Sequence, residues 1–169
     1  MDLDRYMTQM ENNADVIQEM VRLVDNRQAR WKPNRASWSI LEVINHLYDE
    51  EREDFRARLD IMLNNPDQDL PAWDPVAGVT ERAYNEREIT DSVNMFVYER
   101  QDSLRWLNEL EAPDWDRVYK SPQLEMTAGD MFAAWVMHDF LHMRQILKLQ
   151  WFYNKQAFDP YRVDYAGTW

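Results

Sequence analysis

Apolar residues along this chain recur every three or four positions in four long stretches that contain no proline. This spacing is typical of amphipathic helices, because it places the apolar side chains on one helix face. The apolar positions span residues 6–24, 40–63 and 93–110, and a fourth stretch runs from about 128 to 153. The sequence therefore predicts four long helices, each exposing one apolar face to a common core.

Two of these helices have a recognisable start. Ser39 is followed three residues later by Glu42, and Thr127 is followed by Asp130. A hydroxyl at the N-cap and an acid three residues on can satisfy the free backbone amides of a first helical turn. The segments 64–80 and 111–126 contain the Pro, Asp and Asn typical of loops, and a short helical piece is expected at 81–87.

We expect an all-α fold, a four-helix bundle with a short irregular C-terminal tail, because four such helices bury their apolar faces most economically against one another. The 169 residues are enough for one domain. The bundle is expected over residues 1–153. The tail, residues 154–169, carries four aromatic side chains and is expected to pack on the bundle or on a partner subunit: Phe158, Tyr161, Tyr165 and Trp169.

Composition narrows the possible partners and chemistry. The 31 acidic and 19 basic residues give a net charge of −12, which repels phosphate backbones and anionic lipid and argues against nucleic-acid or membrane partners. The absence of cysteine excludes disulfides, thiolate metal ligands and cysteine nucleophiles. The chain begins without the basic and apolar segments of a signal peptide, and its longest apolar run covers only 131–137. We therefore expect a cytoplasmic protein.

The three histidines are the clearest candidate chemistry. His138 and His142 are spaced i, i+4 on the fourth predicted helix, so both imidazoles project from one face. His46 lies about two turns inside the second helix. A bundle can bring these two helices together, and three imidazoles can then hold a divalent transition metal with positions open for water or substrate. The alternative is that each histidine is a hydrogen-bonded core residue.

Other catalytic templates fit less well. A ferritin-like di-iron site needs two Glu-x-x-His pairs, but Val43 and Trp135 occupy the glutamate positions before His46 and His138. The segment from His138 to His142 is similar to a zincin motif with Asp139 in place of the general-base glutamate. No glutamate follows position 125 to complete such a site. Serine-hydrolase, P-loop and dinucleotide motifs are also missing.

Two wider segments resemble the DinB family. Residues 38–47 read Trp-Ser-Ile-Leu-Glu-Val-Ile-Asn-His-Leu, similar to the W-S-x-x-E-x-x-x-H-L start of that family's second helix. The pattern His138-x-x-x-His142-x-x-Gln145 is similar to its fourth helix, and 113–117 to the connection before it. The resemblance extends from the first helix to Trp151. It implies a four-helix bundle with a divalent transition metal bound by His46, His138 and His142, for which zinc and nickel are the leading candidates and iron and manganese the others.

Several side chains near the histidines are candidates for further roles. Glu42 could act as a ligand or base, although capping the helix is a sufficient role for it. Gln145, one turn beyond His142, is a candidate to bind substrate or a metal-bound water. Glu50, one turn after His46, could orient its imidazole, although a solvated charge is an equal alternative.

Arg35 and Arg144 could receive an anionic substrate, although pairing with surface acids is the more usual role of such residues. Trp135 and Met131 are expected in the pocket wall or the core.

These features favour a metal-dependent enzyme acting on a small-molecule substrate. It would activate a low-molecular-weight thiol, as the S-transferases that the resemblance implies do, or water, as a hydrolase does. Because the chain has no cysteine, the thiol would have to be a cosubstrate. The alternative is a non-catalytic helical module, stress-related or engaged in protein interactions, with structural histidines. Eight tryptophans and the aromatic tail favour a homodimer.

Overall fold

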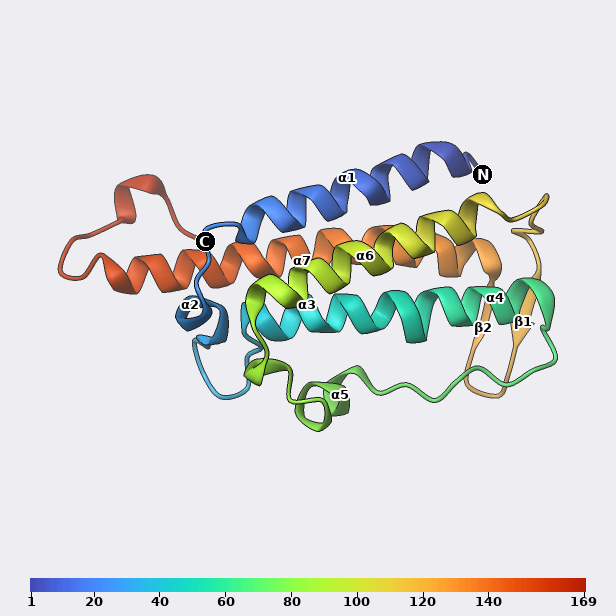
Figure 1. The fold of residues 1–169 in the computed structure, drawn as a ribbon, viewed down its shortest axis with the longest axis horizontal. Helices are drawn as coiled ribbons and strands as arrows, with labels where there is room; N and C mark the ends of the chain where they lie inside the picture. Colours follow the sequence, from blue (N-terminus) through green and yellow to red (C-terminus); the bar gives the residue numbers. More distant parts are fainter.

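Four long helices lie side by side in the computed structural model, which describes residues 1–169 (Figure 1). They are α1 (Leu3–Val21), a second helix formed by α3 (Ile40–Asp49), the π-helical segment η1 (Glu50–Phe55) and α4 (Arg56–Asn64), then α6 (Ile89–Asn108) and α7 (Ala128–Ala157). The four helices and the bundle predicted from periodicity are confirmed. None of the helices combines the length and apolar character needed to cross a lipid bilayer.

The order of the helices around the bundle differs from their order in the sequence. Both α1 and α3 pack mainly against α6 and α7. In Figure 1, α1 and α7 run in one direction, while α3 and α6 run in the other. A long crossover, residues 65–88, therefore returns along the outside of the bundle from the end of α4 to the start of α6. It contains α5 (Pro75–Glu81) and the 3₁₀ turn η2 (Tyr84–Glu86).

Short elements join the helix ends. The helix α2 (Asn26–Arg30) connects α1 to α3, and the 3₁₀ turn η3 (Asp164–Ala166) lies in the tail. Both predicted capping boxes are present, Ser39 with Glu42 and Thr127 with Asp130. The helix α7 continues to Ala157, beyond the predicted end near 153. The chain then turns back, so that the Trp169 ring lies 6.2 Å from that of Trp151.

The segment 111–126 was expected to be a loop, and this prediction was wrong in part. It contains an antiparallel pair of strands, β1 (Val118–Lys120) and β2 (Glu125–Thr127). The turn between them is closed by Ser121, whose backbone N–H donates to the Leu124 carbonyl at 2.8 Å and whose Oγ accepts from the Leu124 N–H at 3.1 Å. A serine side chain thus helps to close this turn, whose residues 121–124 include no glycine.

Two apolar clusters fill the bundle, one toward each end, and every long helix contributes to both. The cluster at the α3 end includes Ile17, Ile44, Phe96 and Ile146, and the cluster at the α4 end includes Met10, Leu59, Leu107 and Phe132. Because these side chains are almost fully buried, hydrophobic burial is the main source of the bundle's stability.

A charged layer centred on the buried side chain of Arg100 lies among these apolar residues. Its guanidinium donates to the Met10 carbonyl of α1 at 2.8 Å, to Glu51 of η1 at 2.6 Å, and to both carboxylate oxygens of Asp139 on α7 at 2.8 Å. Burial alone would lower the pKa of Arg100, but Glu51 and Asp139 raise it above its ordinary value. One cation in α6 therefore links the other three helices.

Two further side chains complete this layer. Asn13 of α1 donates to Asp139 at 3.0 Å, and the Trp135 indole N–H donates to Glu51 at 2.6 Å. Both carboxylates thus receive hydrogen bonds from groups other than Arg100. Neither could remain charged at low cost if the guanidinium were lost, since a buried charge without its partner is strongly destabilising.

We predict that Arg100→Met destabilises the protein by about 3–5 kcal/mol, because it leaves Glu51 and Asp139 buried without their cation. Urea denaturation measures this loss. The matched control is Arg105→Met on the same helix, whose partner Asp102 lies in an exposed pair and which should cost less than about 1 kcal/mol. Equal losses in the two variants would contradict the role assigned to Arg100.

Candidate metal centre

The three histidines meet between α3 and α7, which pack against each other. The Nε2 atom of His138 lies 3.0 Å from Nε2 of His142 and 3.4 Å from Nε2 of His46. The candidate ligand atoms all lie within 4.8 Å of one another. His46 and His138 are 92 residues apart in the sequence, and His138 and His142 are 4 apart. Their ring nitrogens nevertheless face one point, as the sequence predicted.

Burial keeps these imidazoles neutral. Burial is the main cause and the neighbouring histidines add to it, and together they lower the pKa of His46 to about 2 and that of His138 to about 3. Burial also lowers the pKa of His142, against the opposing effect of its hydrogen bond with Gln145. A neutral imidazole has a free lone pair, which is the form that binds a metal ion.

The geometry fits a small divalent cation. Zinc binds imidazole nitrogen at about 2.0–2.1 Å, so tetrahedral ligands lie about 3.4 Å apart, close to the two Nε2 separations observed here. The buried Nδ1 atom of His46 has no hydrogen-bond partner. Its nearest acidic group is Glu50 Oε1, at 3.5 Å. A cation on Nε2 would place the hydrogen on Nδ1, facing this Glu50 oxygen.

Glu50 is buried beside His46 rather than solvated. Its Oε1 accepts a hydrogen bond from the indole N–H of Trp73, a residue of the crossover. Burial raises the pKa of Glu50 to about 8, although the Trp73 hydrogen bond acts in the opposite direction. Of the two roles considered from the sequence, the structure favours orientation of the imidazole over a solvated charge.

Gln145 and Glu42 contact different partners. Gln145 Oε1 lies 2.9 Å from His142 Nδ1, so Nδ1 carries the hydrogen and Nε2 faces the other histidines. Glu42 accepts a hydrogen bond from the Ser39 backbone N–H at 2.8 Å and forms an ion pair with Lys32 at 2.5 Å. It is not part of the three-His group. The capping role of Glu42 is therefore present, while the catalytic roles proposed for Glu42 and Gln145 stay predictions.

Aromatic rings form the walls of the group. The Trp38 ring lies 4.9 Å from that of His46, and the Phe55 ring lies 5.0 Å from that of His138. Trp135 and Met131 are buried in the core, which was one of the two places expected for them. The ion pairs of the chain include neither Arg35 nor Arg144, so the surface pairing considered for these two residues is absent.

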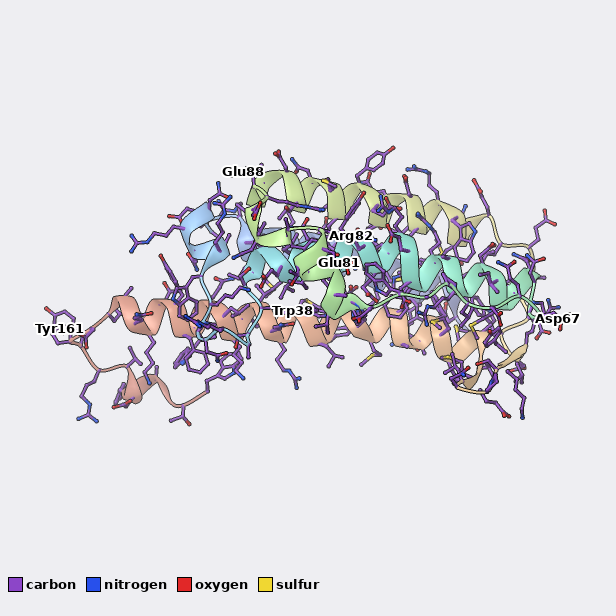
Figure 2. All side chains as sticks on the ribbon, turned by 90° about the horizontal axis from the view of Figure 1, so that it is seen from below. Trp38, Asp67, Glu81, Arg82, Glu88 and Tyr161 are labelled. Atoms are coloured by element: carbon purple, nitrogen blue, oxygen red, sulfur yellow. The ribbon has the colours of Figure 1, made fainter.

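Sequence reasoning missed the crossover as a part of the site. Arg82 lies on the crossover, beside Glu81 (Figure 2). It pairs with Asp49 at 2.9 Å and with Glu53 at 2.6 Å, and its guanidinium lies 4.7 Å from the Trp73 ring. The Tyr84 hydroxyl donates to Asp49 as well. These contacts fasten the crossover to the second helix and hold Trp73 against Glu50. Their signal in the sequence was weak, because a tryptophan in an acidic loop has many possible uses.

The π-helical segment brings Phe55 to the histidines. Phe55 follows His46 by nine residues, which in a regular α-helix of about 100° per residue would place it roughly on the opposite face. In the structure both rings contact His138. The wider turns of η1 correct the rotation, and π-helical turns are frequent at functional sites.

Comparison with known proteins agrees with this arrangement. The family model described as the DinB superfamily matches residues 9–146, a stretch that includes α3, the crossover and all three histidines. The chain belongs to the DinB superfamily. The resemblance inferred from the histidine motifs is thereby confirmed, and it extends over most of the bundle.

A solved structure of the same fold is YfiT from Bacillus subtilis, described as a probable metal-dependent hydrolase with an unusual four-helix bundle topology. The two chains superpose with a TM-score of 0.76 at 16% sequence identity, over 87% of this chain and 85% of YfiT. At this identity the match shows a common fold. A comparison with curated proteins found no significant match.

We predict that His46→Ala and His142→Ala each remove nearly all metal binding, and that the double variant loses little more, because two imidazoles chelate far less tightly than three. Metal content after dialysis against zinc or nickel measures the loss. Added metal should raise the melting temperature of the parent only. Glu42→Gln is the control and should keep its metal. A full equivalent retained by His46→Ala would show that the three residues do not act together.

The metal-free protein should lose stability in mild acid. Below about pH 6.5 the unfolded chain protonates its histidines, whereas the folded pKa values of His46 and His138 are about 2 and 3. As the pH falls below about 6.5, the free energy of unfolding therefore decreases by about 1.4 kcal/mol per pH unit for each such residue. Urea denaturation from pH 7 to pH 5 should show a shallower slope for His138→Gln than for the parent. Parallel slopes would contradict burial of neutral imidazoles.

Proposed function

We propose that this protein is a metal-dependent enzyme that activates a small thiol or a water molecule at His46, His138 and His142. The observation that carries the proposal is the convergence of three neutral Nε2 atoms on one point. Three ligands leave coordination positions free for a reactant, as catalytic metal sites require. A structural site would instead be closed by a fourth protein ligand, and the group contains only these three residues.

A bound divalent cation would act as a Lewis acid. It would lower the pKa of a coordinated thiol or water molecule toward neutrality. The residues of the chain hold and tune the site. Gln145 and Glu50 lie on the Nδ1 sides of His142 and His46, where they can orient the rings and increase their basicity. Trp38 and Phe55 lie against the rings of His46 and His138, and displacing water from these faces would strengthen electrostatic interactions inside the site.

A nucleophilic sulfur has to come from solution, because the chain contains no cysteine. In the S-transferase version, a low-molecular-weight thiol releases its proton to solvent, and its sulfur forms a bond to an electrophilic carbon whose leaving group departs as an anion. In the hydrolase version, water is the nucleophile. The family resemblance of the histidine motifs supports the first version, and the description of YfiT as a probable metal-dependent hydrolase supports the second. A cytoplasmic location, where thiols are kept reduced, forms part of the proposal.

We expect zinc- or nickel-supplemented protein to turn over an activated electrophile, and His46→Ala and chelator-treated protein to be inactive. Two substrates separate the versions. Consumption of 1-chloro-2,4-dinitrobenzene only when a thiol is present identifies a transferase, and thiol-independent cleavage of p-nitrophenyl acetate identifies a hydrolase. Gln145→Ala should retain metal and lose turnover if this residue serves the substrate. Protein purified without an affinity tag that binds no transition metal and catalyses neither reaction would instead support the non-catalytic module.

The homodimer also stays a prediction. Phe140 and Leu147 of α7, and Tyr161 and Tyr165 in the tail, expose much of their surface. These residues support pairing through α7 and the tail.

A further inference from the structure

Two adjoining hollows lie on the exposed flank of α7, next to the three histidines. The first, of about 360 Å³, lies between α7 and the segment before α3 and is lined by Trp38, Gln145, Lys148 and Phe152, among others. The second, of about 460 Å³, is lined by Leu141, Arg144, Gln145, Lys148 and Trp169. Because Gln145 and Lys148 line both, the two hollows form one surface, which we call the α7 groove. Trp38, from the segment before α3, is among the residues that line the first hollow (Figure 2).

The walls of the α7 groove are in direct contact with the candidate metal centre. Gln145 lies 2.9 Å from His142, and the Trp38 ring lies 4.9 Å from that of His46. A molecule in the groove would therefore touch residues that themselves touch two of the three histidines. No histidine lines either hollow, so the groove adjoins the histidine group through Gln145 and Trp38 rather than opening directly onto its Nε2 atoms.

The charge of the α7 groove is opposite to that of the protein. The chain carries a net charge of −12, yet no acidic residue lines either hollow, and Arg144 and Lys148 do. Most basic side chains of the chain pair with an acid, but neither of these two forms an ion pair. They lie one helical turn apart, a spacing at which like charges destabilise a helix. A bound anion would relieve this repulsion.

We propose that the α7 groove binds the carboxylate of a small organic acid, with Arg144 and Lys148 holding the charge and Trp38 and Phe152 contacting the apolar part. This inference rests on the proposed function and adds a substrate class to it: the reactant carries a negative charge several bonds from its reacting atom. Positions 142 and 148 are about 9 Å apart along the helix, which is roughly the span from the sulfur to the carboxylate oxygens of an extended six-carbon mercapto acid.

Three compounds of matched length test the proposal, with binding measured by calorimetry in zinc-supplemented and metal-free protein. They are 6-mercaptohexanoate, 6-mercapto-1-hexanol, which keeps the sulfur but not the charge, and hexanoate, which keeps the charge but not the sulfur. We expect 6-mercaptohexanoate to bind at least about tenfold more tightly than the alcohol, as charge-assisted hydrogen bonds would provide. The carboxylate preference should persist without metal.

Variants locate the charge. In the double variant Arg144→Met/Lys148→Met, the ratio of the affinity for 6-mercaptohexanoate to that for 6-mercapto-1-hexanol should fall close to one. The affinity for the alcohol should be unchanged. Both side chains are exposed, so the variant should melt like the parent. Lys155→Met is the control, because it removes an exposed lysine of the same helix that lines neither hollow and should keep the preference.

The outcomes separate the two proposals. Three results would overturn the anion site. The parent could bind the carboxylate and the alcohol equally, the double variant could keep the carboxylate preference, or Lys155→Met could lose that preference as fully as the double variant. A carboxylate preference that disappears in the double variant supports it. Metal-dependent tightening of 6-mercaptohexanoate over hexanoate reports separately on the histidines. Failure of that tightening alone would count against the thiol version of the proposed function and leave the groove intact.

Discussion

The buried guanidinium of Arg100 sets how the four helices stand against one another. It can satisfy its donors only when Met10 of α1, Glu51 of η1 and Asp139 of α7 are all within reach, and a buried ion pair tolerates little displacement. Asp139 directly follows His138 in the sequence. The rotation of α7 that brings Asp139 to Arg100 therefore also turns His138 and His142 toward His46, so the geometry of the histidine group depends on a contact outside it.

The Arg100 layer and the histidine group thus lie next to each other in the core, and the cost of burying polar groups is met differently in each. Around Arg100, charges of both signs neutralise one another and receive hydrogen bonds from neutral side chains. At the histidines, burial suppresses charge altogether. Metal binding suits the second centre only, because its lone pairs are not already committed to a cation of the protein. Asp139, fully engaged by Arg100, is correspondingly unable to compete with His138 as a ligand.

The fold and the three histidines could be predicted because their signals are local. Helical periodicity, two capping boxes and an i, i+4 pair are each readable within a few residues. The supporting contacts are not local: Trp73 meets Glu50, and Glu51 meets Arg100, only after the helices have packed. A partial signal did exist, since Asn13 interrupts the apolar positions between Met10 and Ile17, and Arg100 those between Phe96 and Leu104. A polar residue within an apolar stripe indicates a buried partner but does not identify it.

The π-helical segment Glu50–Phe55 also affects how related chains should be aligned. A π turn accommodates one residue more than an α turn, so a relative that lacks this segment would present the same faces with one residue fewer. Every position after Phe55 would then correspond to a neighbour one place away, although no loop had changed in length. In a sequence alignment of this superfamily, a one-residue gap inside a continuous helix is therefore physically reasonable. An alignment without this gap would pair residues that face different sides of the bundle.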